Sequence, residues 1–288
     1  MTDTTGDSFV RRFLFDDLEI RGAFARLGSV WLRIQHGRGY PPALGSVLGQ
    51  VAAVTAVIAG NLKQPGRLTF QLQGHGPVEL LVVDCDASLN IRGHARAGAF
   101  DAALPPARLF ADGRLMLTLD VPGLDRPYQS FVPIEGESVA AMFAGYLERS
   151  EQQHTGLWLA ADEQAASCLF VQKLPGADSR DADGWSRVHR LATTVTEDEL
   201  LGLDCEDLLR RLFHEETVRL FRSRALRHDW PRDRERIADV LRSLGRDEIE
   251  RIIDEQGEAR IHDELSNHEY VFDADELRDL IEHPPTLQ

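Results

Sequence analysis

The sequence predicts an α+β fold in three parts. These are a mixed-topology sheet domain with helices (1–176), a charged helical linker (177–227) and a small carboxy-terminal α+β domain (228–288). Strands and helices follow one another without the regular βαβ order of a doubly wound sheet. The composition changes at 175–184, PGADSRDADG, to a polar stretch typical of a boundary. The residues after 228 have short helix and hairpin patterns of their own.

In the first part, a long helix is indicated at 45–62 by apolar residues at three- and four-residue steps. Short β-branched or alternating segments predict strands, the first three of them a meander, around a helix at 138–152. The glycines of the first turn, Gly74 and Gly76, are expected to need positive φ. The predicted strands are 67–73, 78–85, 89–95, 115–121, 129–134, 155–161 and 165–174.

The linker is expected to be helical to about residue 227, with narrow apolar faces that need a docking surface. Thr196 and Glu199 have capping-box spacing, and Asp204 is a second N-cap. In the last part, helices at 234–244 and 247–256 end at Gly245 and Gly257, and EARIH and HEYVFD form a hairpin. Asp273 caps a final helix to 282. A unit of this size usually needs a metal, a disulfide or a docking partner.

The charge excludes several classes of protein. Forty-seven acidic residues against 32 basic ones give a net charge of −15, which argues against a nucleic-acid or anionic-membrane surface. No run of about eighteen apolar residues stands out, so we expect no membrane span. The polar start MTDTTGDSFV lacks the pattern of a secretory signal, which favours the cytoplasm.

Reactive residues do not form a recognisable catalytic pattern. Cys85, Cys168 and Cys205 lie far apart, so their spacing predicts neither a disulfide framework nor a zinc site, and we expect each to be buried. Asp84 and Asp86 flank Cys85, and His75 lies in a glycine-rich turn, but no nucleophile has a base at recognisable spacing. We therefore expect the protein not to be an enzyme.

Three long blocks resemble one known family. They are GRLTFQLQGHGPVELLVVDCD (66–86), EGESVAAMFAGYLERSEQQHT (135–155) and LLGLDCEDLLRRLFHEETVRLF (200–221). Their order and spacing resemble the 33 kDa redox-regulated heat-shock chaperonins over about 16–280. The resemblance implies an ATP-independent holdase that binds unfolded client proteins, with a metastable linker and a zinc domain. In that family, four cysteines in C-x-C and C-x-x-C pairs hold zinc, oxidation releases it and exposes apolar surface, and monomers exchange with dimers on activation.

This chain departs from the family at the switch. Alignment places His228 and Trp230 at the C-x-C positions, and Asp263 and Ser266 at the C-x-x-C positions. None of these is a thiol, so we expect no zinc cofactor and no switch disulfide. Trp230 and Leu265 are expected to pack as an apolar plug that replaces part of the lost stabilisation. The small domain is then marginally stable or held by docking on the linker.

The resulting hypothesis is a holdase without a thiol trigger, either constitutive or opened by heat. Trp158, Trp185 and Phe213 are candidate client-contact residues, which the sequence does not rank. An adaptor that delivers a specific partner on the same fold is the alternative from another class.

A reworked metal site is a further alternative, since His228, His262, Asp263 and His268 carry nitrogen or oxygen ligands for zinc. Their spacing matches no known ligand pattern. His262 and Asp263 would point to opposite faces of a strand unless a turn intervenes.

Overall fold

A computed structural model describes residues 6–101, 104–111 and 113–282. The chain divides into two compact units, Met1–His228 and Asp229–Gln288, and each is described by itself. The mixed strands and helices confirm the predicted α+β class.

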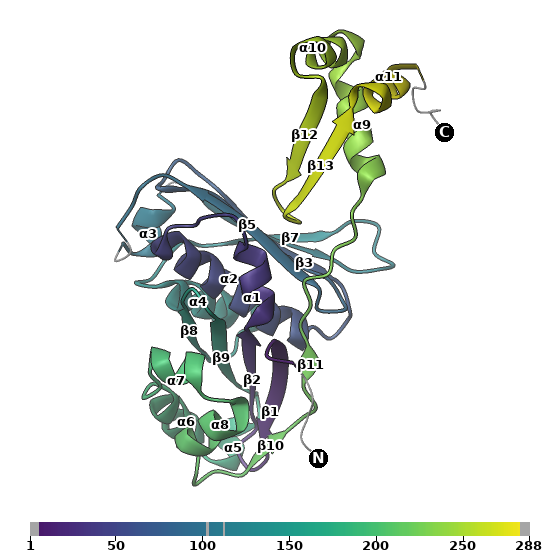
Figure 1. The fold of residues 1–288 in the computed structure, drawn as a ribbon. Coiled ribbons are helices and arrows are strands. Elements are labelled where there is room, and N and C mark those ends of the chain that lie inside the picture. The colour runs from purple at the N-terminus through teal and green to yellow at the C-terminus, as the bar shows by residue number, and fades with distance from the viewer. Residues whose placement is uncertain (1–5, 102–103, 112, 283–288) are drawn as a thin grey trace. The chain divides into compact units, whose positions relative to one another are not determined.

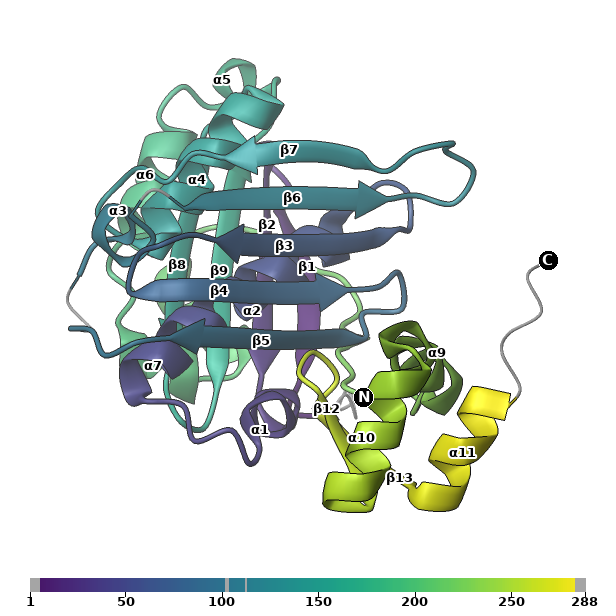
Figure 2. The same ribbon diagram turned by 90° about the horizontal axis from the view of Figure 1, so that it is seen from above.

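The first unit contains two antiparallel sheets (Figures 1 and 2). One has the order β10-β1-β2-β9-β8, with β11 also pairing with β1, and the other has the order β5-β4-β3-β6-β7. The strands of the first are β1 (Phe9–Phe15), β2 (Ile20–Leu27), β8 (Thr155–Ala161), β9 (Ala166–Lys173), β10 (Val218–Leu220) and β11 (Arg224–Ala225). Those of the second are β3 (Arg67–Gln73), β4 (Val78–Cys85), β5 (Ile91–Ala97), β6 (Arg114–Asp120) and β7 (Tyr128–Val132).

Helix α2 (Pro42–Asn61) lies between the two sheets and is buried against both. A Cβ at Gly49 would come within 2.7 Å of the Cβ of Ala161, so glycine lets α2 approach the first sheet closely. By length and composition α2 would also be able to cross a membrane, contrary to the expectation from the sequence, yet 78% of its apolar window is buried inside the protein. That burial is typical of a core helix. The remaining helices before the linker are α1 (Ser29–Gln35), α3 (Pro106–Leu109) and α4 (Val139–Glu151).

Strand β9 is buried on both faces because two different layers cover it. Cys168 and Phe170 contribute to the core around α2. The alternate residues Leu169 and Val171 contribute to a second apolar cluster, on the opposite face of the sheet. The linker helices cover that opposite face (Figure 1).

The linker contains α5 (Ala177–Arg180), α6 (Gly184–Ala192), α7 (Glu197–Gly202) and α8 (Cys205–Leu212). The capping box of Thr196 and Glu199 and the Asp204 cap are confirmed. The prediction of helix to residue 227 is wrong, because the chain forms the short strands β10 and β11 after α8. Both pair with β1, whose free edge offers unpaired backbone groups to the returning chain.

The turn between β3 and β4 corrects another prediction. Gly74 and Gly76 are absent from the positive-φ residues of the described chain. A Cβ at Gly74 would lie 2.5 Å from the Cα of Gly113, and one at Gly76 would lie 2.6 Å from the carbonyl oxygen of Leu109. These glycines therefore permit close backbone packing and are not needed for a left-handed conformation.

The second unit consists of α9 (Arg234–Leu244), α10 (Arg246–Gln256), the hairpin β12 (Glu258–Asp263) and β13 (His268–Asp273), and α11 (Ala274–Glu282). The helix ends at Gly245 and Gly257 and the Asp273 cap are confirmed. Trp230 and Leu265, the residues of the predicted plug, are partly buried and do not belong to the apolar cluster of this unit, so the plug stays a prediction. That cluster contains Ile237, Ala238, Leu241, Ile249, Ala259, Tyr270, Phe272, Leu277 and Leu280.

Candidate functional site

One face of the first sheet is strongly apolar and is covered by the linker. We call it the covered face. Phe13 stands opposite Gly22 in the β1–β2 register, and a Cβ at Gly22 would lie 2.1 Å from the Phe13 ring, so glycine lets the ring lie across β2. The large residues of the covered face are almost fully buried. They are Phe13, Phe15, Ile20, Phe24, Leu169 and Val171.

The linker helices supply the cover. Phe213, at the end of α8, packs edge-on against Phe15 with ring centroids 4.9 Å apart. Helices of six to nine residues are marginal on their own in water, so α6, α7 and α8 depend on this packing for their stability. The other linker residues buried in this apolar cluster are Val188, Ala192, Leu200, Cys205, Leu208, Leu209 and Leu212.

The polar contacts between the linker helices and the first sheet involve partly exposed side chains, as in the ion pair of Asp178 of α5 with Lys173 of β9. The Nη1 of Arg11 lies 2.9 Å from the Oε1 of Glu206, and the Nη1 of Arg26 donates to the carbonyl oxygen of Leu203 at 3.0 Å. Partly exposed ion pairs of this kind contribute about 0–1 kcal/mol. The cover is therefore held mainly by apolar burial.

The three aromatic candidates have different environments. Trp158 and Trp185 are half-buried and meet around His189, with ring centroids 5.4 and 5.5 Å from the imidazole. Trp158 stands opposite Leu169 in the strand register, at the border of the covered face. Phe213 is only 2% exposed, so its candidacy as an exposed contact is not supported in this state of the protein.

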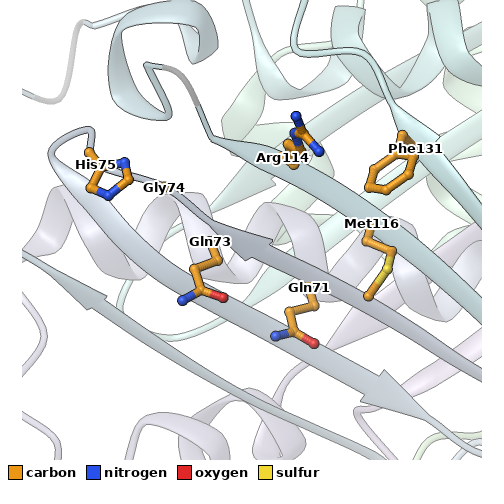
Figure 3. Close-up of a pocket in the computed structure, with 7 residues that line it drawn as sticks. All are labelled: Gln71, Gln73, Gly74, His75, Arg114, Met116 and Phe131. Carbon is orange, nitrogen blue, oxygen red and sulfur yellow. The ribbon is translucent and has the colours of Figure 1, made fainter.

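A second apolar feature lies on the outer face of the other sheet. Phe131 on the edge strand β7 is 58% exposed and stands opposite Met116 of β6. Figure 3 shows both beside Arg114 on a hollow that reaches the β3–β4 turn. The sequence contained a signal for this surface, since these residues occupy the outward positions of alternating strands. The hollow is lined by Gln71, Gln73, Gly74, His75, Arg114, Met116 and Phe131.

The positions aligned with the switch cysteines have other partners. The Nδ1 of His228 lies 2.9 Å from the carbonyl oxygen of Ile91. Ser266 is buried, and Asp263 accepts the backbone N–H groups of Leu265 and Ser266 at 3.1 and 3.4 Å. Partial burial opposes ionisation of Asp263, but the hydrogen bonds from Ser266 and the nearby positive charge of Arg236 hold its pKa below the ordinary value.

These residues do not fit the zinc site of the family. They offer no thiolate, and the guanidinium of Arg236 lies 2.6 Å from the Oδ2 of Asp263, where a cation would bind. Within the part of the chain that the structure describes, no three His, Cys, Asp or Glu side chains gather around a common point. His262 and Asp263 are consecutive residues of β12, so their side chains leave opposite faces.

The three cysteines are separate, buried thiols. Burial raises the pKa of Cys85 and Cys168, and raises that of Cys205 to about 12. Each is therefore protonated at neutral pH, whereas oxidation by peroxide requires the thiolate. Neighbouring Asp84 binds Arg92 at 3.0 Å, which gives this buried carboxylate a structural partner.

Comparison with known proteins identifies the class and then the family. Two curated relatives are each named 33 kDa chaperonin. The protein of Chromobacterium violaceum is 39% identical over 95% of this chain and 94% of its own length, and that of Methylobacillus flagellatus is 38% identical over 92% and 91%. The crystal structure of a 33 kDa chaperonin (heat shock protein 33 homolog) from Thermotoga maritima has the same fold, with a TM-score of 0.79, 21% identity, and coverage of 96% of this chain and 98% of that one.

These likenesses place the chain in a class of molecular chaperones. The model of the family described as Hsp33 protein matches residues 8–273. The chain therefore belongs to the Hsp33 family, as the resemblance of the three sequence blocks predicted.

Proposed function

We propose that the protein is an ATP-independent holdase whose client-binding surface is the covered face. The observation that carries the proposal is the apolar cluster shared by the sheet and the short linker helices. Detachment of the helices would expose aromatic residues such as Phe13, Phe15 and Phe24 at once. Each large apolar side chain returned to water costs about 1.5–3 kcal/mol, a cost that contact with an unfolded client removes.

Heat is the proposed trigger. A cover of short helices, joined to the sheet by partly exposed ion pairs, is expected to open locally at a lower free energy than the core around α2. Oxidation has no comparable point of action, since the three thiols are buried and protonated at neutral pH. The proposed mechanism therefore needs neither zinc nor a disulfide switch.

Charge and burial support the remaining parts of the proposal. A net charge of −15 keeps a protein in solution while it exposes apolar area, and it disfavours nucleic acid as a partner. We place the protein in the cytoplasm with unfolded proteins as partners. Once the linker has detached, the exposed apolar faces of two copies could bind each other, which supports a homodimer of the activated form.

The outer hollow favours a second candidate function. Phe131 and Met116 are accessible while the linker remains in place, and β7 is an edge strand. An edge strand next to an exposed aromatic residue suits the addition of an extended segment of a partner. An adaptor that holds one specific partner there would need no opening of the linker.

A light-scattering assay of an aggregating client separates these proposals. The full chain is tested reduced, after peroxide and after preheating, with Phe131→Ser as a parallel variant. The holdase proposal predicts suppression that increases on heating, is unchanged by peroxide and survives Phe131→Ser. Strict dependence on peroxide would contradict the holdase proposal. The adaptor would be supported if the protein suppressed no aggregation and if a pull-down recovered one stoichiometric partner with the wild type but not with Phe131→Ser.

A further inference from the structure

We propose that three arginines, Arg232, Arg234 and Arg236, replace the metal as the link between the start of α9 and the β12–β13 hairpin. We call them the arginine clamp. In the aligned family pattern, the two cysteine pairs lie in these same segments, just before α9 and at the hairpin turn. The clamp concerns the folding of the second unit, and its test does not depend on client binding.

Each arginine reaches a different part of the hairpin. The Nη1 of Arg232 donates to the carbonyl oxygen of Glu269 at 2.7 Å. The Nη2 of Arg234 donates to the carbonyl oxygen of Val271 at 2.8 Å. Arg236 completes the series with its ion pair to Asp263, whose side chain is only 10% exposed. The contacts therefore extend from the end of β12 along β13.

Two arginines also lie over aromatic rings of the hairpin. The guanidinium carbon of Arg234 is 4.1 Å from the ring centroid of Phe272, and that of Arg232 is 5.8 Å from the ring centroid of Tyr270. A planar guanidinium can stack on a ring and donate to a carbonyl at the same time, which lysine cannot do equally well. The backbone N–H of Asp233 donates to the Tyr270 hydroxyl at 2.9 Å and fixes the same approach.

Helix stability does not explain these arginines. Arg234 and Arg236 lie in the first turn of α9, where positive charge opposes the helix dipole. Their contacts with the hairpin, together with the ion pair of Arg234 with Glu276 of α11, offset that cost. Asp263 has a matching role, because one carboxylate closes the turn through Leu265 and Ser266 and also pairs with Arg236.

The link should consequently respond to different chemistry from a metal–thiolate site. A chelator has no ion to remove, and an oxidant has no sulfur to attack. Loss of charge at Asp263 or Arg236 would instead release one end of the clamp. The apolar cluster would remain, so the second unit should loosen at the hairpin without unfolding.

Hydrogen exchange of the full chain, followed by mass spectrometry of peptides, tests the clamp. Arg236→Gln and Asp263→Asn should each increase exchange of β12 and β13 by up to about fivefold, the range expected for a partly exposed ion pair, and the double variant should add little to either, because both remove the same contact. Arg278→Gln is the matched control, since its ion pair with Asp275 stays within α11. Peptides of the first unit should not change in any variant.

Treatment of the wild type with a strong chelator supplies the second readout. The clamp predicts unchanged exchange of the hairpin and no metal in elemental analysis of the purified protein. Additive effects of the two substitutions, an effect of Arg278→Gln equal to theirs, or a chelator-induced increase in exchange would overturn the proposal.

Discussion

Truncation of Phe213 to alanine should give client capture without the heating that the proposed holdase requires. Phe213 is 2% exposed and makes an edge-on contact with Phe15 at 4.9 Å. In the closed state Phe213 packs the linker against the covered face. In the proposed open state the contact between the Phe213 and Phe15 rings is broken. The substitution should therefore act on the opening equilibrium itself.

The magnitude follows from the burial. Phe→Ala substitutions in a packed core cost about 3–5 kcal/mol. If about 3 kcal/mol of that appears in the free energy of linker opening, the open population rises by a factor of about 100 or more, at about 1.4 kcal/mol for each factor of ten. Client capture before heating should increase in proportion while the open form remains the minor one.

The control is Phe143→Ala. Phe143 is fully buried and packs edge-on against Phe70 at 5.0 Å, a closely similar pair in the core around α2 and away from the linker. Light scattering with a denatured client should show early capture for Phe213→Ala and not for Phe143→Ala, below the unfolding temperature of both. Equal activity of the two variants, or wild-type behaviour of Phe213→Ala despite faster exchange of α6–α8, would refute the reasoning.

Three further outcomes are expected. Peroxide at neutral pH should not change aggregation suppression, and thiol titration should still find Cys85, Cys168 and Cys205 reduced. The reason is that burial raises the pKa of each thiol, so little reactive thiolate is present. Despite partial burial, the hydrogen bonds from Ser266 and the charge of Arg236 hold the pKa of Asp263 below its ordinary value, so its contribution to the second unit should be complete above the ordinary carboxyl pKa and lost as pH falls through the lowered one. NMR signals of the hairpin should move in that acidic range in the wild type and not in Asp263→Asn. Phe131→Ser should leave aggregation suppression unchanged both before and after heating, because Phe131 lies on the edge strand of the other sheet and not on the covered face; light scattering checks this.

Local signals in the sequence predicted much of the fold because they act over a few residues. The capping box at Thr196, the caps at Asp204 and Asp273 and the period of α2 depend on short-range geometry, and all are found in the structure. Strands β1 and β2 and helix α1 were not predicted. Consecutive buried residues on β2 hide the alternation by which a strand is recognised, because both faces of that strand are covered.

Features that depend on distant partners were predicted less well. β10 and β11 exist because β1 offers a free edge, which the sequence of the linker does not reveal. The tight packing at Gly74 depends on Gly113, far along the chain. The lack of a thiol at the four aligned positions was evident from residue identity alone, but the partners of Asp263 emerged only when α9 and the hairpin turn were seen together.

Pulsed hydrogen exchange of α6–α8 during a temperature ramp, run beside client capture with and without peroxide, tests the central claim most directly. The account predicts that protection of these helices is lost in the same temperature range in which capture begins, and that peroxide moves neither transition. Capture that begins while α6–α8 remain protected, or protection that is lost only after peroxide, would contradict it.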